Sequence, residues 1–398
     1  MMLTRRGTLL GLSAILATSR VRLALAAAET PRRFIVVLLR GALDGLSAVV
    51  PYGDVHLRGL RAGLLAAEPG RPGGLLDLGG FYGLDPALGG LHAMYREGSL
   101  LPVHAIAGPY RTRSHFEAQD LLQTGGPDAS ITSGWLNRLV AELAAARADA
   151  GAFAVGMGMP LLLRGPAAVG SFAPDRFAMP SPDLYRRIAA LNQPDPLLGP
   201  AIARGLHDQH FDQEILDPEG APESASGGAG YGDFAHLAAA AGKLLAAPDG
   251  PRIAAFQLEG WDTHGSQVAL LHGPLAGLDA GLVALRNSLG GTWQETVVLV
   301  ITEFGRTARM NGTHGTDHGT ATVAFLLGGR IAGGRVSATW PGLGPGQLFQ
   351  DRDLAPTADI RALAKGVLAG QFGLSRSALS RVFPDSSAAA PMTGLLRS

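Results

Sequence analysis

The sequence Phe34-Ile35-Val36-Val37-Leu38-Leu39 is an uninterrupted apolar run. A strand with one solvated face alternates apolar and polar residues, whereas a continuous run is typical of a central strand that is covered on both faces. The run therefore predicts the middle of a parallel sheet between two layers of helices. Similar runs predict five more strands, at residues 100–106, 152–155, 253–258, 296–302 and 321–327.

Segments with helical periodicity separate these strands. We expect helices at residues 86–96, 115–123, 133–146, 233–245, 267–289 and 357–368. Alternating strands and helices are typical of an α/β fold with a doubly wound, mostly parallel central sheet flanked by helices. Turn-forming residues at 217–230 and 328–350 predict surface loops, and neither loop separates two cores. We therefore expect residues 29–398 to form a single domain with its core at about 32–385.

The composition supports a large core and excludes several functions. Of 398 residues, 46% are hydrophobic and 17% are charged, which is typical of a folded chain. The 33 basic and 33 acidic residues balance, so the sequence lacks the charge pattern of a nucleic-acid-binding protein. Cysteine is absent, which excludes disulfides, zinc–thiolate sites and a thiol nucleophile. A metal would be held by carboxylates and imidazoles, and a nucleophile would be a hydroxyl or water.

The first residues have the features of an export signal. Arg5-Arg6 precede an apolar run at residues 9–17, and small residues at 26–28 suit a signal peptidase. We expect a twin-arginine signal peptide at residues 1–28, recognised by the twin-arginine translocase, and a periplasmic or otherwise exported protein. An uncleaved membrane anchor is the alternative, although the apolar run is shorter than the ~20 residues that span a bilayer.

Polar residues gather where the predicted strands end. Ligands of open α/β sheets bind beyond the carboxyl ends of the strands, so these positions are candidates for a functional site. They hold Asp44, Arg113, Ser114, His115, Asp262, His264, Glu303 and Arg306, and His318 lies just before the sixth predicted strand.

The spacing of Asp262 and His264 suits one metal ion. Alternate residues of an extended segment point the same way, so this pair can present two ligands together. His318 could complete a three-ligand set that leaves a position open for water or substrate. Asp44 and Glu303 could form a second, carboxylate-rich position nearby.

Arg113 and Arg306 are candidate clamps for phosphate or sulfate, because a guanidinium group matches the oxygen spacing of these anions. Several of these residues could instead have purely structural roles. Asp44 could belong to a turn, Glu303 could pair with Arg306, and His318 could be a core histidine bonded to the preceding aspartate.

Five motifs together resemble the domain-of-unknown-function family 1501. They are LRGALDGL at 39–46, RSHF at 113–116, GWDTH at 260–264, TEFGRT at 302–307 and GTDHG at 315–319. The resemblance runs from about residue 32 to the C-terminal helix. The family is grouped with the alkaline phosphatase-like fold of phosphatases, sulfatases, phosphodiesterases and phosphomutases, and its members typically carry twin-arginine signals. The resemblance implies a central sheet with a two-metal site on strand-end loops.

By chain order, the resemblance implies a role for each motif. Asp44 resembles the first carboxylate ligand, and Ser114 resembles the hydroxyl nucleophile at a helix N-terminus, where backbone N–H groups favour an anion. Asp262 and His264 look like the Asp/His pair of the first metal, and His318 is similar to its last histidine.

The fifth strand departs from the superfamily pattern. The superfamily usually reads Asp-His there, whereas this sequence reads Glu303-Phe304, and phenylalanine cannot bind metal. Either His115 or another residue supplies the imidazole, or the second metal site is weak or absent. A rival alignment makes Asp317-His318 the Asp-His pair.

The expected function is that of an exported, metal-dependent hydrolase whose partner is an anionic small-molecule ester of phosphate or sulfate. The expected cofactor is a divalent metal, with zinc favoured and manganese or calcium as alternatives. Ser114 is the candidate nucleophile, and Thr112 and Ser47 are alternatives.

The alternative is a non-catalytic envelope binding or structural protein on the same fold with a degenerate second metal site. The resemblance also implies an envelope protein partner. A nucleotide-binding oxidoreductase is disfavoured, because no G-x-G-x-x-G motif directly follows the first predicted strand.

Overall fold

The computed structural model describes residues 31–128, 130–145, 151–156, 158–172 and 232–397. The expected signal peptide and the loop expected at 217–230 lie outside the described residues.

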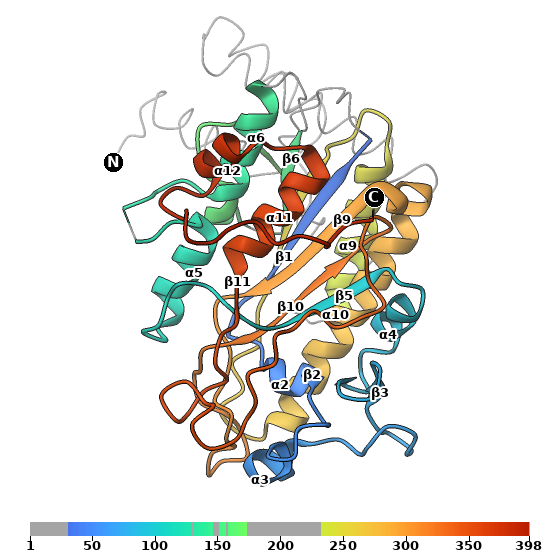
Figure 1. Ribbon diagram of the computed structural model, residues 1–398. Helices are drawn as coiled ribbons and strands as arrows, with labels where there is room; N and C mark the ends of the chain where they lie inside the picture. Colours follow the sequence, from blue (N-terminus) through green and yellow to red (C-terminus); the bar gives the residue numbers. More distant parts are fainter. Residues whose placement is uncertain (1–30, 129, 146–150, 157, 173–231, 398) are drawn as a thin grey trace, which may run out of the picture.

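The centre of the described part is an eight-stranded sheet (Figure 1). The strands lie in the order β11-β5-β10-β9-β1-β8-β6-β7. The predicted fold class and all six predicted strands are confirmed, and two short strands, β7 and β11, were not predicted. The bounds are β1 Arg33–Leu39, β5 Leu100–Ala107, β6 Ala152–Val155, β7 Gly170–Phe172, β8 Ile253–Leu258, β9 Thr296–Thr302, β10 Thr322–Leu327 and β11 Ala358–Asp359.

The run 34–39 lies in β1, between β8 and β9, and is buried on both faces. Ile35, Val37 and Leu39 pack into one hydrophobic core. Their neighbours Phe34 and Val36 pack into a second core on the opposite face. An apolar residue is therefore required at every position, which is why this strand does not alternate.

Helices cover both faces (Figure 1). Residues of α4, α9 and α10 contribute to the first core, and residues of α6, α11 and α12 contribute to the second. The helix bounds are α2 Gly45–Ala48, α3 Leu57–Arg61, α4 Gly89–Arg96, α5 His115–Thr124, α6 Trp135–Ala145, α9 Gly232–Ala246, α10 Gln267–Leu289, α11 Ile360–Phe372 and α12 Arg376–Val382. Short 3₁₀ turns span Ala62–Leu64, Leu161–Leu163 and Gly290–Glu295, and a small sheet joins β2 Val49–Val50, β4 Gly83–Leu84 and β3 Leu76–Asp77.

Among the described helices, α10 with its 3₁₀ extension is the one long and apolar enough to cross a membrane by length and composition alone. Leu271, Leu275 and Leu278 pack into the first core. This burial accounts for the apolar character of its inner face.

Two features differ from a simple reading of the sequence. The last predicted helix begins at Ile360 and not at 357, because Ala358 and Asp359 pair with β5 and Asp359 caps the first turn. Strand β10 is antiparallel to both β5 and β9, whereas β1 runs parallel to β8 and β9. The start of β10 therefore lies at the same edge as the carboxyl ends of its neighbours, which brings His318 to that edge.

His104 in β5 is a fully buried histidine. Its Nε2 donates to the carbonyl oxygen of Val49 at 2.8 Å, and its Nδ1 accepts from the backbone N–H of Ala105 at 2.8 Å. A second ring proton would face that N–H group. Burial lowers the pKa of His104 from 6.5 to about 4, so the folded protein keeps this side chain neutral.

We expect this histidine to make folding sensitive to acid. Between pH 6.5 and 4 this histidine binds a proton in the unfolded chain but stays neutral in the folded chain. The free energy of unfolding therefore decreases as the pH is lowered through this range. The difference between a pKa of about 4 in the folded chain and 6.5 in the unfolded chain corresponds to a loss of roughly 3 kcal/mol in the free energy of unfolding. His104→Gln removes the titration and keeps an N–H donor for Val49. Urea unfolding from pH 7.5 to 4.5 should show a shallower pH dependence for this variant, and equal slopes would contradict the prediction.

Candidate metal centre

Segments that are distant in the sequence meet at one edge of the sheet. The loop after β8, the loop after β9, the segment before β10 and the first turn of α5 contribute the residues described below. Two motif glycines let these segments pack backbone to backbone. A Cβ at Gly315 would lie 2.3 Å from the carbonyl carbon of His264, and one at Gly41 would lie 2.7 Å from the nitrogen of Asp262. A larger residue at either position would push the loops apart.

Three imidazoles and one carboxylate converge at this edge. His318 Nε2 lies 3.0 Å from His115 Nε2 and 3.0 Å from His264 Nε2. Asp262 Oδ1 lies 3.0 Å from His264 Nε2, and its Oδ2 lies 3.5 Å from His115 Nε2. The ligand atoms of His115, Asp262 and His318 all lie within 4.8 Å of one another. We call these four residues the metal cluster.

The other ring nitrogen of each histidine faces an oxygen. His115 Nδ1 donates to Glu303 Oε1 at 2.7 Å, and His318 Nδ1 donates to the carbonyl oxygen of Arg113 at 3.0 Å. His264 Nδ1 lies 3.5 Å from Asp317 Oδ1. A carbonyl or carboxylate oxygen can only accept, so the contacts of His115 and His318 place the proton on Nδ1 and leave their Nε2 lone pairs facing the cluster, whereas His264 has a carboxylate oxygen near each ring nitrogen.

This tautomer pattern is the one that metal-binding histidines adopt. Without a cation, the Nε2 lone pairs of His115 and His318 would face each other beside the carboxylate of Asp262. A divalent ion shared by the four groups would satisfy all of them at once, and a set of three nitrogens and one oxygen suits zinc and related ions. The cluster residues therefore fit a divalent metal.

The electrostatics favour an ionised Asp262 and a neutral His318, whereas the hydrogen bond to Glu303 raises the pKa of His115. Burial raises the pKa of Asp262, but the bond and charge of Arg306 and the nearby histidines outweigh it, and the pKa lies below its usual value. Burial also lowers the pKa of His318. At neutral pH the carboxylate is ionised and this imidazole is neutral, as coordination requires.

Glu303 lies behind His115 and not among the converging atoms. Its Oε1 accepts from His115 and from Gln119 Nε2 at 3.0 Å, and its Oε2 accepts from Thr302 at 2.8 Å. Phe304 packs on the His115 ring, with 4.9 Å between ring centroids. Glu303 thus orients His115, whose imidazole lies in the same cluster as Asp262 and His318 and not at a separate second site.

Arg306 differs from the expected anion clamp. Its side chain is fully buried, and its donors reach the carbonyl oxygens of Gly41 at 2.7 Å, Ala42 at 2.8 Å and Thr316 at 3.2 Å. Its NH2 group also donates to Asp262 Oδ1 at 2.5 Å. Arg306 therefore holds the carboxylate of the cluster in place and does not face solvent.

Arg113 and Ser114 lie beside the cluster at the start of α5. The guanidinium group of Arg113 is bound to the buried Asp353, with its NH2 at 2.7 Å from Oδ2, and to Gln350. The Arg113 backbone has a φ of 61°, in the left-handed region, and its carbonyl oxygen contacts His318. Ser114 is the N-cap of α5, and its hydroxyl makes no hydrogen bond to the described residues.

Asp44 lies outside the metal cluster. It is 1% exposed, and its Oδ2 accepts from Arg61 at 2.8 Å, Ser47 at 2.9 Å and Gln267 at 2.5 Å. The second carboxylate-rich position expected from Asp44 and Glu303 is therefore not formed, because protein donors already surround both carboxylates. Within the described residues, one group of acidic and histidine side chains is arranged for an ion.

Three buried side chains that support this centre were not predicted from the sequence: Arg61, Gln267 and Asp353. Gln267 follows the GWDTH motif after Gly265 and Ser266 and is the first residue of α10. A polar side chain at the start of an apolar helix was the sequence signal that indicates such a role. Arg61 and Asp353 had no comparable signal.

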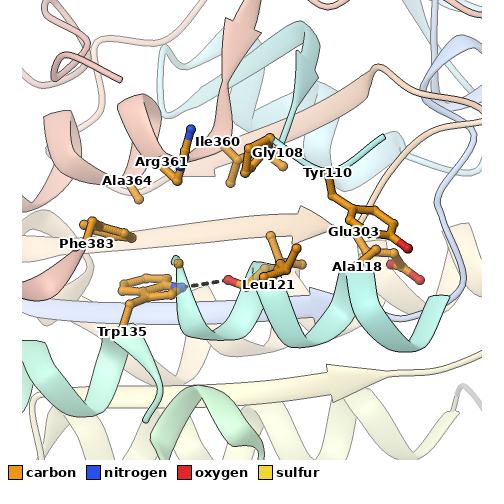
Figure 2. Close-up of a pocket in the computed structure, with 13 residues that line it drawn as sticks. Gly108, Tyr110, Ala118, Leu121, Trp135, Glu303, Ile360, Arg361, Ala364 and Phe383 are labelled. Carbon is orange, nitrogen blue, oxygen red and sulfur yellow. Dashed lines mark hydrogen bonds between the residues drawn. The ribbon is translucent and has the colours of Figure 1, made fainter. Parts of the chain in front are cut away.

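A narrow apolar pocket adjoins the back of the centre between α5 and α11 (Figure 2). Trp135 and Phe383 line one end, and Tyr110 and Glu303 line the other. Arg361, which also lines it, is paired with Asp359 at 2.7 Å. The pocket is thus lined by Glu303, which orients His115, and its one arginine is already paired with a carboxylate.

The fold and the cluster define an α/β protein with a candidate metal centre built from histidine and aspartate. The sequence profile of the family described as "Protein of unknown function (DUF1501)" matches residues 104–383, well over half of the chain and including all four cluster residues. The chain belongs to this family. No protein with curated annotation matches the sequence.

Solved structures with a similar fold have low sequence identity. A protein in the alkaline phosphatase superfamily from Vibrio parahaemolyticus is 12% identical, with a TM-score of 0.40 over 92% of this chain and 75% of that chain. The phosphonate monoester hydrolase of Agrobacterium radiobacter is 12% identical, with a TM-score of 0.40 over 86% and 74%. The C-terminal periplasmic domain of EcEptC from Escherichia coli, in complex with Zn, is 12% identical, with a TM-score of 0.37 over 95% and 94%. These likenesses concern the fold alone.

We expect the wild-type protein to bind one zinc ion per chain at the metal cluster. Replacing one ligand, as in His318→Ala or Asp262→Ala, should weaken binding by about 100-fold or more, since losing even an outer partner of a ligand costs 10–100-fold. Titration calorimetry of metal-stripped protein measures this. His92→Ala is the control, because His92 contacts the carbonyl oxygen of Asp77 and no cluster residue. Equal affinity in His318→Ala and His92→Ala would contradict the assignment.

Proposed function

We propose that this protein is a metal-dependent hydrolase that acts on phosphate or sulfate esters. The observation that carries the proposal is the convergence of three Nε2 atoms and a carboxylate at an open edge of the sheet. The side chains of Asp262 and His264 are 44% and 47% exposed, so substrate and water can reach the cluster. The sequence resemblance supports esters of phosphate or sulfate as the substrate class.

A bound divalent ion would supply Lewis-acid chemistry, polarising the ester and increasing the acidity of a nearby hydroxyl or water. The chain's own residues orient the reaction. Ser114 lies in the chain between Arg113, whose carbonyl oxygen contacts His318, and His115, which is bound to Glu303. Its position at the N-terminus of the ten-residue α5 favours an anion there, because backbone N–H groups point outward. These features support Ser114 as the nucleophile.

Neither arginine near the cluster is free to balance the negative charge of a transferring phosphoryl or sulfuryl group. Arg306 is buried against Asp262, and Arg113 is paired with Asp353. Charge compensation would therefore come mainly from the metal and from the first turn of α5.

We expect zinc- or manganese-loaded protein to hydrolyse generic aryl phosphate, aryl phosphodiester or aryl sulfate substrates, and chelation to abolish turnover. Ser114→Ala should lower kcat by at least about 100-fold while zinc affinity stays unchanged, because the hydroxyl acts on the substrate and not on the ion. Steady-state turnover assays measure kcat, and titration calorimetry measures zinc affinity. A metal-loaded protein that hydrolyses none of the three substrate types would sink the enzymatic proposal.

A non-catalytic envelope protein that binds metal is the second candidate. The observation that favours it is the loss of the second position, where Asp44 is bound to Arg61 and Gln267. In that case the metal would stabilise the fold, and a protein partner in the envelope would contact the exposed edge. Zinc binding without turnover of any ester, together with a higher Tm on zinc addition, would favour this candidate over the hydrolase.

Export through the twin-arginine route is a further part of the proposal, supported by Arg5-Arg6 and the apolar run that follows. We expect the double substitution Arg5→Lys and Arg6→Lys to leave uncleaved protein in the cytoplasm, because lysine does not replace the guanidinium pair. Immunoblots of periplasmic and cytoplasmic fractions measure the distribution. Replacing Arg20 with Lys is the matched control, and equal export of all forms would contradict this route.

A further inference from the structure

The structure assigns a positioning role to Gln267, which ties together the two loops that carry three of the four cluster residues. The inference rests on the proposed metal centre. It also gives a role to Asp44, which the sequence places at a strand end but which lies outside the cluster.

The Gln267 side chain is buried and has a partner on each side of its amide. It is 1% exposed at the first position of α10. Its Nε2 donates to Asp44 Oδ2 at 2.5 Å and to Ser47 Oγ at 3.0 Å. Its Oε1 accepts from Thr263 Oγ1 at 3.1 Å and from Thr316 Oγ1 at 2.6 Å. A buried amide with every donor and acceptor in use is fixed in a single orientation.

The two threonines belong to the loops of the cluster. Thr263 lies between Asp262 and His264, and Thr316 lies two residues before His318. The backbone N–H of Thr316 also donates to the carbonyl oxygen of Thr263 at 3.3 Å. Gln267 therefore joins the two loops from the buried side, directly behind their ligands.

Asp44 sets the direction of the amide. A carboxylate only accepts, so it draws the Nε2 group of Gln267 and turns Oε1 toward the threonines. Arg61 holds this carboxylate, with NH1 at 2.8 Å from Oδ2, and donates from Nε to the carbonyl oxygen of Ala308 at 3.0 Å. The ion pair is desolvated on both sides, with side chains 0% and 1% exposed. The strand-end aspartate thus acts on the cluster through Gln267.

The test removes the two hydroxyl donors without changing side-chain volume. We expect the double variant Thr263→Val/Thr316→Val of the full chain to bind zinc 10–100-fold more weakly than wild type in calorimetry, the range found for outer supports of metal ligands. Thr263→Ser/Thr316→Ser keeps both hydroxyls and should bind within a few-fold of wild type.

Thr296→Val is the matched control. Thr296 is 0% exposed and donates from Oγ1 to the carbonyl oxygen of Thr292 at 2.8 Å, and it lies at the start of β9, at the end of the strand away from Glu303. This substitution removes one buried hydroxyl and should lower Tm without changing zinc affinity. If the valine double variant weakened zinc binding no more than Thr296→Val does, the positioning role would be overturned.

Hydrogen exchange of the metal-free protein gives a second readout that needs no ion. We expect faster exchange at 260–266 and 313–319 in the valine double variant, and unchanged exchange there in Thr296→Val. Should wild type bind no zinc, the proposed function fails, and exchange alone decides the role of Gln267. Unchanged exchange in both loops of the double variant would overturn it.

Discussion

The orientation of the imidazole rings is the constraint on which the metal centre depends. His115 and His318 each donate from Nδ1 to an oxygen that can only accept, and His264 lies near a third such oxygen. The Nε2 atoms of His115 and His318 must then face the cluster with their lone pairs. Repulsion among these lone pairs and the carboxylate of Asp262 would favour separation of the loops, so the arrangement is stable only if buried contacts or a cation hold it.

Sheet topology supplies the first of these restraints. Strands β8 and β9 run parallel to β1 and release their loops at one edge, while the antiparallel β10 enters the sheet from that same edge. A residue before β10 can therefore meet residues after β8. The buried Arg306 then joins the loops, donating to Gly41 and Ala42 after β1 and to Asp262 after β8. An arginine suits this task because its planar group reaches several acceptors at once.

Much of this could be predicted from short-range pattern. The apolar run 34–39 indicated a doubly covered strand. Positions just after the fourth predicted strand and just before the sixth indicated that Asp262, His264 and His318 could share a site, and these residues lie close together. The roles of Glu303 and Arg306 could not be predicted in the same way. Whether a carboxylate faces an ion or a histidine, and whether a guanidinium group faces solvent or backbone carbonyls, depends on packing between segments far apart in sequence.

The same packing has an electrostatic consequence for any anionic substrate. Both arginines that sequence pattern suggested as clamps are paired with carboxylates, Arg306 with Asp262 and Arg113 with Asp353. Their charges are largely neutralised locally, and the former is removed from solvent. Asp44 is likewise neutralised by Arg61. These charged residues thus support the loops of the cluster and do not face a substrate. A bound ion and the first turn of α5 would then be the main sources of positive potential for an incoming phosphate or sulfate group.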